Sequence, residues 1–167
     1  MEREHTCCVT GHRAIPDDKV PFVRGQLKAA VIDAITQGYT HFISGFAQGV
    51  DLMFAEIVVE LKASFPITLE AAIPCPSRMQ TPDETFQRLI GCCDVVKILS
   101  DHYFKGCFMQ RNRYMVDQSS LVIAVWDGRE TGGTAETVRY AKRKGAQLYR
   151  IDTKPEANKI DFSQLVW

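Results

Sequence analysis

Short apolar runs alternate with longer amphipathic runs along this chain. The apolar runs have the length of strands and fall at residues 6–10, 41–44, 67–73, 94–99, 120–126 and 147–151. The amphipathic runs have the length of helices and fall at residues 18–37, 52–63, 81–92, 106–117 and 134–144. This alternation is typical of βαβ units, in which helices join parallel strands. It predicts an α/β fold: a doubly wound, mostly parallel sheet of about five to six strands, flanked by helices.

Local signals support several of these boundaries. Gly38 suits the position just after the first helix, where a left-handed backbone ends it. Thr81 has the character of an N-cap, with Pro82 in the first helical position and acidic residues after it. Residues 161–167 are apolar enough to pack down. The chain length and the absence of a long linker predict a single domain over residues 1–167.

The composition is that of an average globular domain. Of the 167 residues, 46% are hydrophobic and 24% charged, which is enough to bury a sizeable core. The formal net charge is zero, which makes nucleic acid an unfavoured partner, although the run Arg139 to Lys144 is locally basic. The apolar runs are too short to span a membrane, and the polar residues 1–5 form no signal-peptide core. We therefore expect a cytoplasmic protein with no membrane partner.

The six cysteines, at positions 7, 8, 75, 92, 93 and 107, lack the spacing of a metal site. There is no C-x-x-C motif, and adjacent cysteines are poorly placed to share a metal ion or form a disulfide. We expect reduced thiols that pack as small hydrophobic residues, and no structural metal or other cofactor.

Two glycine-containing loops carry the strongest functional signal. The first, S-G-F-A-Q-G-V-D at residues 44–51, follows a strand and opens a helix. The second, G-G-T at residues 132–134, follows the most apolar strand and also opens a helix. Glycine allows a sharp turn and a close approach to a ligand, and a helix N-terminus attracts anions. The two loops predict one crevice that holds a nucleotide-like ligand.

Other loops at the same edge of the sheet add polar groups. The sequence T-G-H-R at residues 10–13 ends the first strand, residues 74–78 end the third, and residues 127–134 end the fifth. His12 and Arg13 can donate hydrogen bonds to a phosphate or a carboxylate. Alternatively, His12 caps a helix and Arg13 pairs with Asp17 or Asp18.

Two acidic residues at helix starts admit two interpretations. Asp51 and Glu136 can cap free N–H groups, or they can accept hydrogen bonds from a ribose hydroxyl. A carboxylate near the ribose could also activate water. Arg111 lies on a helix from which it could reach the ligand edge, whereas Arg113 suits the solvent-exposed face. Trp126 could stack on a base or pack in the core.

The candidate site is therefore defined by loop and helix-start residues. The residues expected to bind ligand are Thr10, Gly11, His12, Arg13, Ser44, Gly45, Gly49, Asp51, Asp127, Gly128, Gly132, Gly133 and Thr134.

Five sequence blocks together resemble the SLOG superfamily of Rossmann-like proteins, and most closely its YpsA-like branch. The blocks are T-G-H-R at 10–13, S-G-x-x-x-G-V-D at 44–51 with A-E at 55–56, P-C at 74–75, Q-R-N-R-Y-M-V-D at 110–117, and A-V-W-D-G at 124–128 followed by G-G-T. They occur in order over nearly the whole chain. The resemblance implies a Rossmann-like fold and a nucleotide or nucleotide-derived ligand.

A more distant resemblance is to the Lonely guy phosphoribohydrolases of the same superfamily. Those enzymes place an arginine and a glutamate at the scissile ribose, and the matching residues here are Arg111 and Glu136. This resemblance implies catalytic roles for both. The chain departs from the enzymes' motifs, because Asn112 replaces a lysine, the proline before the Gly-Gly pair is missing, and residues 127–131 form an added loop.

These observations favour a nucleotide-binding module, such as a sensor, that binds without turnover. The alternative is an N-glycosidase that cleaves a nucleoside monophosphate to free base and ribose phosphate. Binding of single-stranded DNA, suggested by DNA-processing relatives, is less favoured because the chain has no long basic groove. Apolar residues on 52–61 or 104–115 could support a homo-oligomer, although core packing accounts for most of them.

Overall fold

The structure, a computed structural model, describes residues 2–153, so the expected packing of residues 161–167 lies outside the described residues. The elements, in chain order, are η1 Arg3–His5, β1 Thr6–Gly11, η2 Asp17–Lys19, α1 Val20–Thr36, β2 His41–Ser44, α2 Val50–Leu61, β3 Thr68–Ile73, η3 Pro76–Gln80, α3 Glu84–Ile90, β4 Val95–Ile98, α4 Cys107–Asp117, β5 Leu121–Val125, α5 Gly133–Arg143 and β6 Gln147–Ile151. All the predicted strands and long helices are present.

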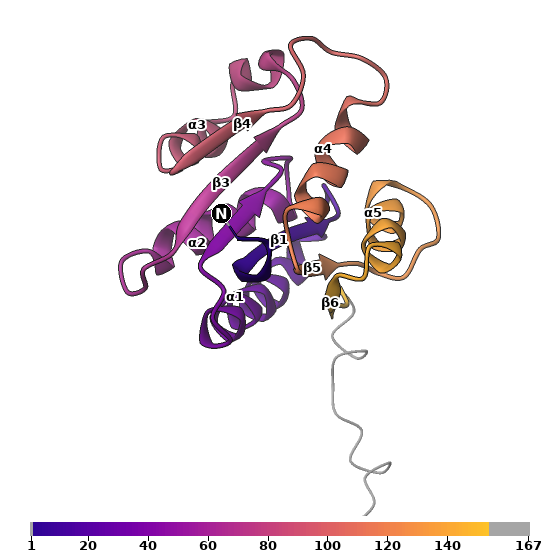
Figure 1. Cartoon of the computed structure of the whole chain (residues 1–167). Coiled ribbons are helices and arrows are strands. Elements are labelled where there is room, and N and C mark those ends of the chain that lie inside the picture. Colours follow the sequence, from indigo (N-terminus) through magenta and orange to yellow (C-terminus); the bar gives the residue numbers. More distant parts are fainter. Residues whose placement is uncertain (1, 154–167) are drawn as a thin grey trace, which may run out of the picture.

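The six strands form one parallel sheet in the order β4-β3-β2-β1-β5-β6 (Figure 1). One face of the sheet packs against α1, α2 and α3, and the other packs against α4 and α5. The predicted α/β, Rossmann-like, doubly wound fold is therefore confirmed, with six strands and with parallel pairing throughout.

Successive side chains of the central strands enter opposite cores. Cys7 and Val9 of β1 join the larger core under α1 and α2, whereas Cys8 joins the smaller core under α4 and α5. Phe42 and Ile43 of β2 divide in the same way. Because both faces of these strands are covered, the middle residues of each strand are apolar and buried, which explains the short apolar runs of the sequence.

One helix begins later than the sequence suggests. We expected α3 to be capped by Thr81, but Asp83 is the N-cap, and its side chain accepts a hydrogen bond from the backbone N–H of Phe86. The hydroxyl of Thr81 instead accepts from the N–H of Asp83 at 3.3 Å and forms the turn before the helix. Pro82 therefore precedes the helix, because Thr81 and Asp83 both carry cap-forming side chains and that of Asp83 closes the first helical turn.

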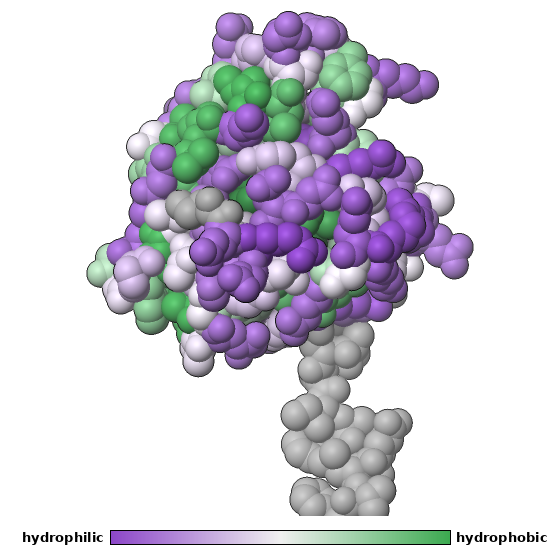
Figure 2. All heavy atoms as spheres, viewed as in Figure 1, coloured by the Kyte–Doolittle hydropathy of each residue, from purple (hydrophilic) through white to green (hydrophobic). Residues whose placement is uncertain are grey.

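The edge strand β4 carries exposed apolar side chains. Val95, Val96 and Ile98 are 37–41% exposed, and Figure 2 shows a hydrophobic patch on the side of the molecule where β4 lies. Lys97 interrupts this run, and a charge on an edge strand discourages pairing with other chains. The apolar residues of α2 face the core instead. Among residues 2–153, every helix is too short or too polar to cross a membrane.

The cysteines of the described region are free thiols. Cys7, Cys8, Cys75 and Cys107 are buried, and Cys92 and Cys93 are half-buried. Burial raises the pKa of the Cys8 thiol to about 12, so it stays protonated at neutral pH.

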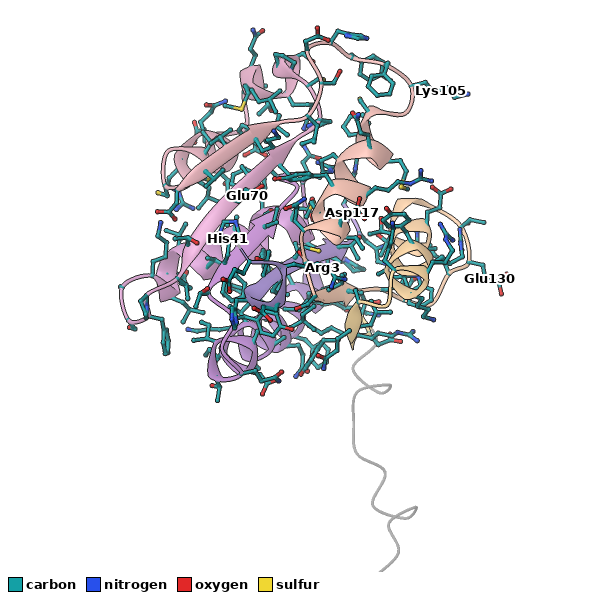
Figure 3. The ribbon with its side chains drawn as sticks, in the orientation of Figure 1. Arg3, His41, Glu70, Lys105, Asp117 and Glu130 are labelled. Carbon is teal, nitrogen blue, oxygen red and sulfur yellow. The ribbon has the colours of Figure 1, made fainter. Side chains whose placement is uncertain are left out.

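A buried polar network fixes α4 to the sheet. Figure 3 shows His41 and Glu70 on the neighbouring strands β2 and β3, and the imidazole Nε2 lies 2.7 Å from Glu70 Oε1. The hydroxyl of Tyr114 on α4 donates to Glu70 Oε2 at 2.6 Å. His41 Nδ1 lies 2.6 Å from the hydroxyl of Thr68. Burial opposes the charge of Glu70, but hydrogen bonds from His41 and Tyr114 outweigh it and lower the carboxyl pKa.

Candidate functional site

The strand order reverses direction between β1 and β5. The chain builds β2, β3 and β4 on one side of β1 and then crosses to build β5 and β6 on the other. Loops that leave the carboxyl ends of β1 and β5 therefore diverge and leave a crevice, which is the usual ligand site of such sheets. A cavity of about 410 Å³ opens there.

The cavity joins residues that lie far apart in the sequence. It is lined by Val9, Thr10, Gly11, His12, Arg13, Ala47, Asp51, Lys105, Phe108, Met109, Arg111, Asn112, Arg129, Thr131, Gly132, Gly133 and Thr134. Nine of these were expected from the sequence: Thr10, Gly11, His12, Arg13, Asp51, Arg111, Gly132, Gly133 and Thr134. The lining comes from the end of β1, the start of α2, α4 and the loop before α5.

Two glycines allow β1 to lie against the start of α2. A Cβ atom on Gly11 would fall 2.5 Å from the side chain of Val50. A Cβ on Gly49 would fall 2.4 Å from the carbonyl oxygen of Arg13, and its φ of +82° also favours glycine. We expected Gly49 to let the backbone approach a ligand, but its missing side chain makes room for another segment of the chain.

Gly45 leaves space for two buried charged side chains, those of Asp51 and Arg111. A Cβ at this position would lie 2.7 Å from Asp51 Oδ2 and 2.9 Å from the guanidinium carbon of Arg111. The guanidinium donates to the carbonyl oxygen of Gly45 at 2.5 Å, and Asp51 accepts from the N–H of Ala47 at 3.2 Å. The space beside Gly45 therefore holds both charged groups at the base of the cavity.

Burial and opposite charge act against each other on this pair. Burial raises the pKa of the Asp51 carboxyl, and the charge of Arg111, the N–H of Ala47 and the charge of Arg13 partly offset that shift. Burial likewise lowers the pKa of Arg111, which is only 4% exposed, and Asp51 opposes that shift. The charge of each group therefore offsets part of the pKa shift that burial causes in the other.

The turn between β2 and α2 is fixed by hydrogen bonds of the buried Ser44 side chain and by packing of Phe46. The hydroxyl of Ser44 donates to the carbonyl oxygen of Asp51 at 2.8 Å and accepts from the N–H of Phe46 at 3.2 Å. Phe46 has a φ of +57°, which is strained for a bulky residue, and its ring packs edge-on against Phe86 at 5.4 Å. Ser44 thus shapes the loop and does not line the cavity.

Helix α4 contributes an aromatic ring that contacts two arginines. The guanidinium carbon of Arg13 lies 5.2 Å from the ring centre of Phe108, and that of Arg111 lies 5.8 Å from it. These cation–π contacts orient Arg13, which is exposed, toward the cavity. Lys105 adds a further positive charge from the connection that leads into α4 (Figure 3).

The rim of the cavity is fixed by His12 and Asp127. His12 Nε2 accepts a hydrogen bond from the backbone N–H of Asp127 at 3.2 Å and lies 3.4 Å from the carboxylate of the same residue. Burial lowers the pKa of His12, so the imidazole is neutral at neutral pH, as an acceptor must be. The Asp127 carboxylate binds Arg129, which holds that arginine over the cavity.

The start of α5 faces the cavity without obstruction. Gly132 is the N-cap with a φ of +98°, and a Cβ on Gly132 or Gly133 would meet no atom within 4 Å. Thr134 lines the same wall. The free N–H groups of this first turn and the partial positive charge of the helix favour an anion at this wall.

Six expected site residues do not line the cavity, namely Ser44, Gly45, Gly49, Asp127, Gly128 and Glu136. Glu136 is exposed and lines an adjacent hollow, so the structure does not bring Glu136 and Arg111 into one cavity. The loop at residues 74–78 contributes no lining residue.

The indole of Trp126 lies 4.7 Å from the guanidinium of Arg150 and donates to the carbonyl of Arg129 at 2.9 Å.

The lining residues missed in the sequence are Val9, Ala47, Lys105, Phe108, Met109, Asn112, Arg129 and Thr131. Four of these precede or follow Arg111 on α4 or its leading connection. Phe108 lies three residues before Arg111 and therefore on the same side of the helix, so helical spacing could have indicated it. Asn112 directly follows Arg111 and has no such spacing. Among residues 2–153, the group suited to share a metal ion is Glu2, Glu4 and His5, which is exposed at the chain start.

The doubly wound sheet and the cationic cavity at its switch point define a Rossmann-like α/β protein with a cavity at the strand carboxyl ends. The family model described as "YspA SLOG family" matches residues 7–157. The chain therefore belongs to the YpsA SLOG family, as the sequence blocks indicated.

Uncharacterised bacterial proteins are among its relatives. A UPF0398 protein of Ligilactobacillus salivarius is 23% identical over 154 residues, which cover 83% of this chain and 84% of the relative. The SPbeta prophage-derived protein YoqJ of Bacillus subtilis is 29% identical over 166 residues, which cover 86% of this chain and 95% of the relative.

Solved structures share the fold at low sequence identity. DNA processing protein A of Streptococcus pneumoniae matches with a TM-score of 0.67 and 17% identity, over 88% of this chain and 50% of that protein. The Helicobacter pylori protein, described for its single-stranded DNA binding mode, matches with a TM-score of 0.63 and 19% identity, over 87% of this chain and 64% of that protein. TM1055 matches with a TM-score of 0.57 and 18% identity, over 89% of this chain and 72% of that protein. The chain thus spans about half to two thirds of the two DNA processing proteins.

Proposed function

We propose that the cavity binds a nucleotide or a nucleotide-derived small molecule, with a phosphate group at the start of α5. The observation that carries this proposal is the unobstructed helix start at Gly132 and Gly133, which faces a cavity lined by four positively charged side chains. These are Arg13, Lys105, Arg111 and Arg129. The volume of about 410 Å³ is within the usual range for a small ligand.

The remaining lining groups suit the rest of a nucleotide. Asp51 offers a carboxylate at the base of the cavity, where it can accept hydrogen bonds from ribose hydroxyls. Phe108, Met109 and Val9 offer apolar surface to a base. Binding without reaction would make the protein a sensor or carrier.

Binding should depend on the open space at the start of α5. We expect Gly133→Val to weaken the binding of AMP at least tenfold by calorimetry, because the added side chain would occupy the phosphate position. Gly25→Val is the matched control, since Gly25 also has open space around it but lies on α1, away from the cavity. The proposal fails if the wild type binds none of AMP, IMP, GMP, ATP, NAD and ADP-ribose, or if both variants bind alike.

A second candidate function, hydrolysis of the N-glycosidic bond, is favoured by one observation. Asp51 and Arg111 line the same cavity, so a carboxylate and an arginine can both face a bound ribose. The raised pKa of Asp51 suits a group that accepts or donates a proton in catalysis.

The two carboxylates can be separated by mutation. If the protein is a hydrolase, we expect Asp51→Asn to bind nucleoside monophosphates but to lose release of free base by about 10²-fold or more, measured by chromatography. Glu136→Gln tests the role that the phosphoribohydrolase resemblance implies for Glu136. Turnover that survives in both variants would rule out a carboxylate mechanism, and absence of turnover in the wild type would leave binding as the function.

A further inference from the structure

A second hollow lies beside the cavity, along the seam between α4 and α5. The two helices pack against each other on the same face of the sheet. The seam, of about 180 Å³, is lined by Met109 and Arg113 from α4 and by Glu136, Arg139, Tyr140 and Arg143 from α5. Figure 2 shows hydrophilic residues over this side of the molecule.

The seam continues from the proposed nucleotide site. Met109 lines both the cavity and the seam, and the first turn of α5, which forms a cavity wall, leads directly to Glu136 and Arg139. Side chains on a helix tilt toward its N-terminus, so Arg139 and Arg143 lean toward the cavity. From Gly133 to Arg139 and Arg143 the helix rises by about 9 and 15 Å.

The seam has an excess of positive charge. Three arginines and one glutamate line it, although the whole chain has equal numbers of basic and acidic residues. Within residues 2–153, neither Arg113 nor Arg143 has a carboxylate oxygen within 4.0 Å, so neither forms an ion pair there. Both contact Tyr140 instead, with their guanidinium carbons 5.3 and 5.6 Å from its ring centre. The hydroxyl of Tyr140 donates to Asp117 at 2.7 Å, which fixes the position of the ring.

We propose that the seam is a second phosphate subsite, and that the ligand is a linear dinucleotide whose first phosphate lies at the start of α5 and whose second lies among Arg113, Arg139 and Arg143. This inference rests on the proposed function of the cavity. A mononucleotide would leave the seam empty. The guanidinium carbons of Arg113 and Arg143 lie 5.3 and 5.6 Å from the ring centre of Tyr140, and Arg139 lines the same hollow, so three guanidinium groups can donate hydrogen bonds to a phosphate there.

The test compares AMP with the 5′-phosphorylated dinucleotide pApA by calorimetry. In the wild type we expect pApA to bind about tenfold more tightly than AMP. In the double variant Arg113→Ala, Arg143→Ala this advantage should disappear while the affinity for AMP stays the same, since two exposed phosphate contacts are worth about threefold each. Lys142→Ala is the control, because it removes a positive charge from α5 without touching the seam.

Each outcome has one meaning. If neither AMP nor pApA binds the wild type, the nucleotide site itself is refuted. If AMP binds and pApA binds no better, or if the double variant keeps the preference for pApA, the nucleotide site stands and the second subsite is refuted. If a twelve-residue single strand binds about 100-fold more tightly than pApA, the surface is an interface for nucleic acid and the dinucleotide is refuted.

Discussion

At the scale of single residues, the cavity depends on interactions between protein groups at its base and rim. The charges of Asp51 and Arg111 each offset part of the pKa shift that burial causes in the other, and Gly45 leaves the space beside both side chains. His12 is the residue of the rim that responds to pH. Its neutral form accepts the N–H of Asp127, and burial lowers its pKa.

The sign of the His12 effect follows from this lowered pKa. Below the ordinary pKa of about 6.5 the unfolded chain binds a proton that the folded protein resists, so the free energy of unfolding falls as pH drops through the folded pKa. We expect His12→Asn to flatten this decline between about pH 7 and pH 5, measured by urea unfolding. Equal slopes in the variant and the wild type would contradict the assignment.

At the scale of elements, α4 is the helix that most directly shapes the site. Phe108, Met109, Arg111 and Asn112 all reach the cavity from its first half. Its second half is fixed to the sheet through the bond from Tyr114 to Glu70, which also contacts His41. A network three residues beyond Arg111 therefore sets where the cavity-lining side chains lie.

Removal of the hydrogen bond from Tyr114 to Glu70 should lower the free energy of unfolding and weaken nucleotide binding. We expect Tyr114→Phe to lower the free energy of unfolding by about 1.5–3 kcal/mol, because a partly buried hydrogen bond to a carboxylate is lost. It should also weaken nucleotide binding in the cavity, which Tyr114 does not line. The control is Tyr149→Phe, which alters an exposed tyrosine on β6. An unchanged unfolding free energy in Tyr114→Phe would refute the role of the network.

At the scale of the whole molecule, the sequence pattern predicts the architecture well but the site less completely. The strands and helices follow from alternating apolar runs, and the sheet edge that carries the site follows from parallel strands. The role of each glycine does not follow, because a missing Cβ can face open space at a cavity wall, as at Gly133, or another part of the chain, as at Gly49. The contribution of α4 depends on how that helix lies across the sheet, which its own periodicity does not determine.

The space beside Gly45 also has a consequence for the family's divergence. Any side chain at this position would collide with Asp51 and Arg111. Substitutions at these three positions should therefore be coupled in evolution. We expect aligned relatives to keep all three together or to change all three together. A relative with a larger residue in place of Gly45 should therefore have exchanged its buried charges as well.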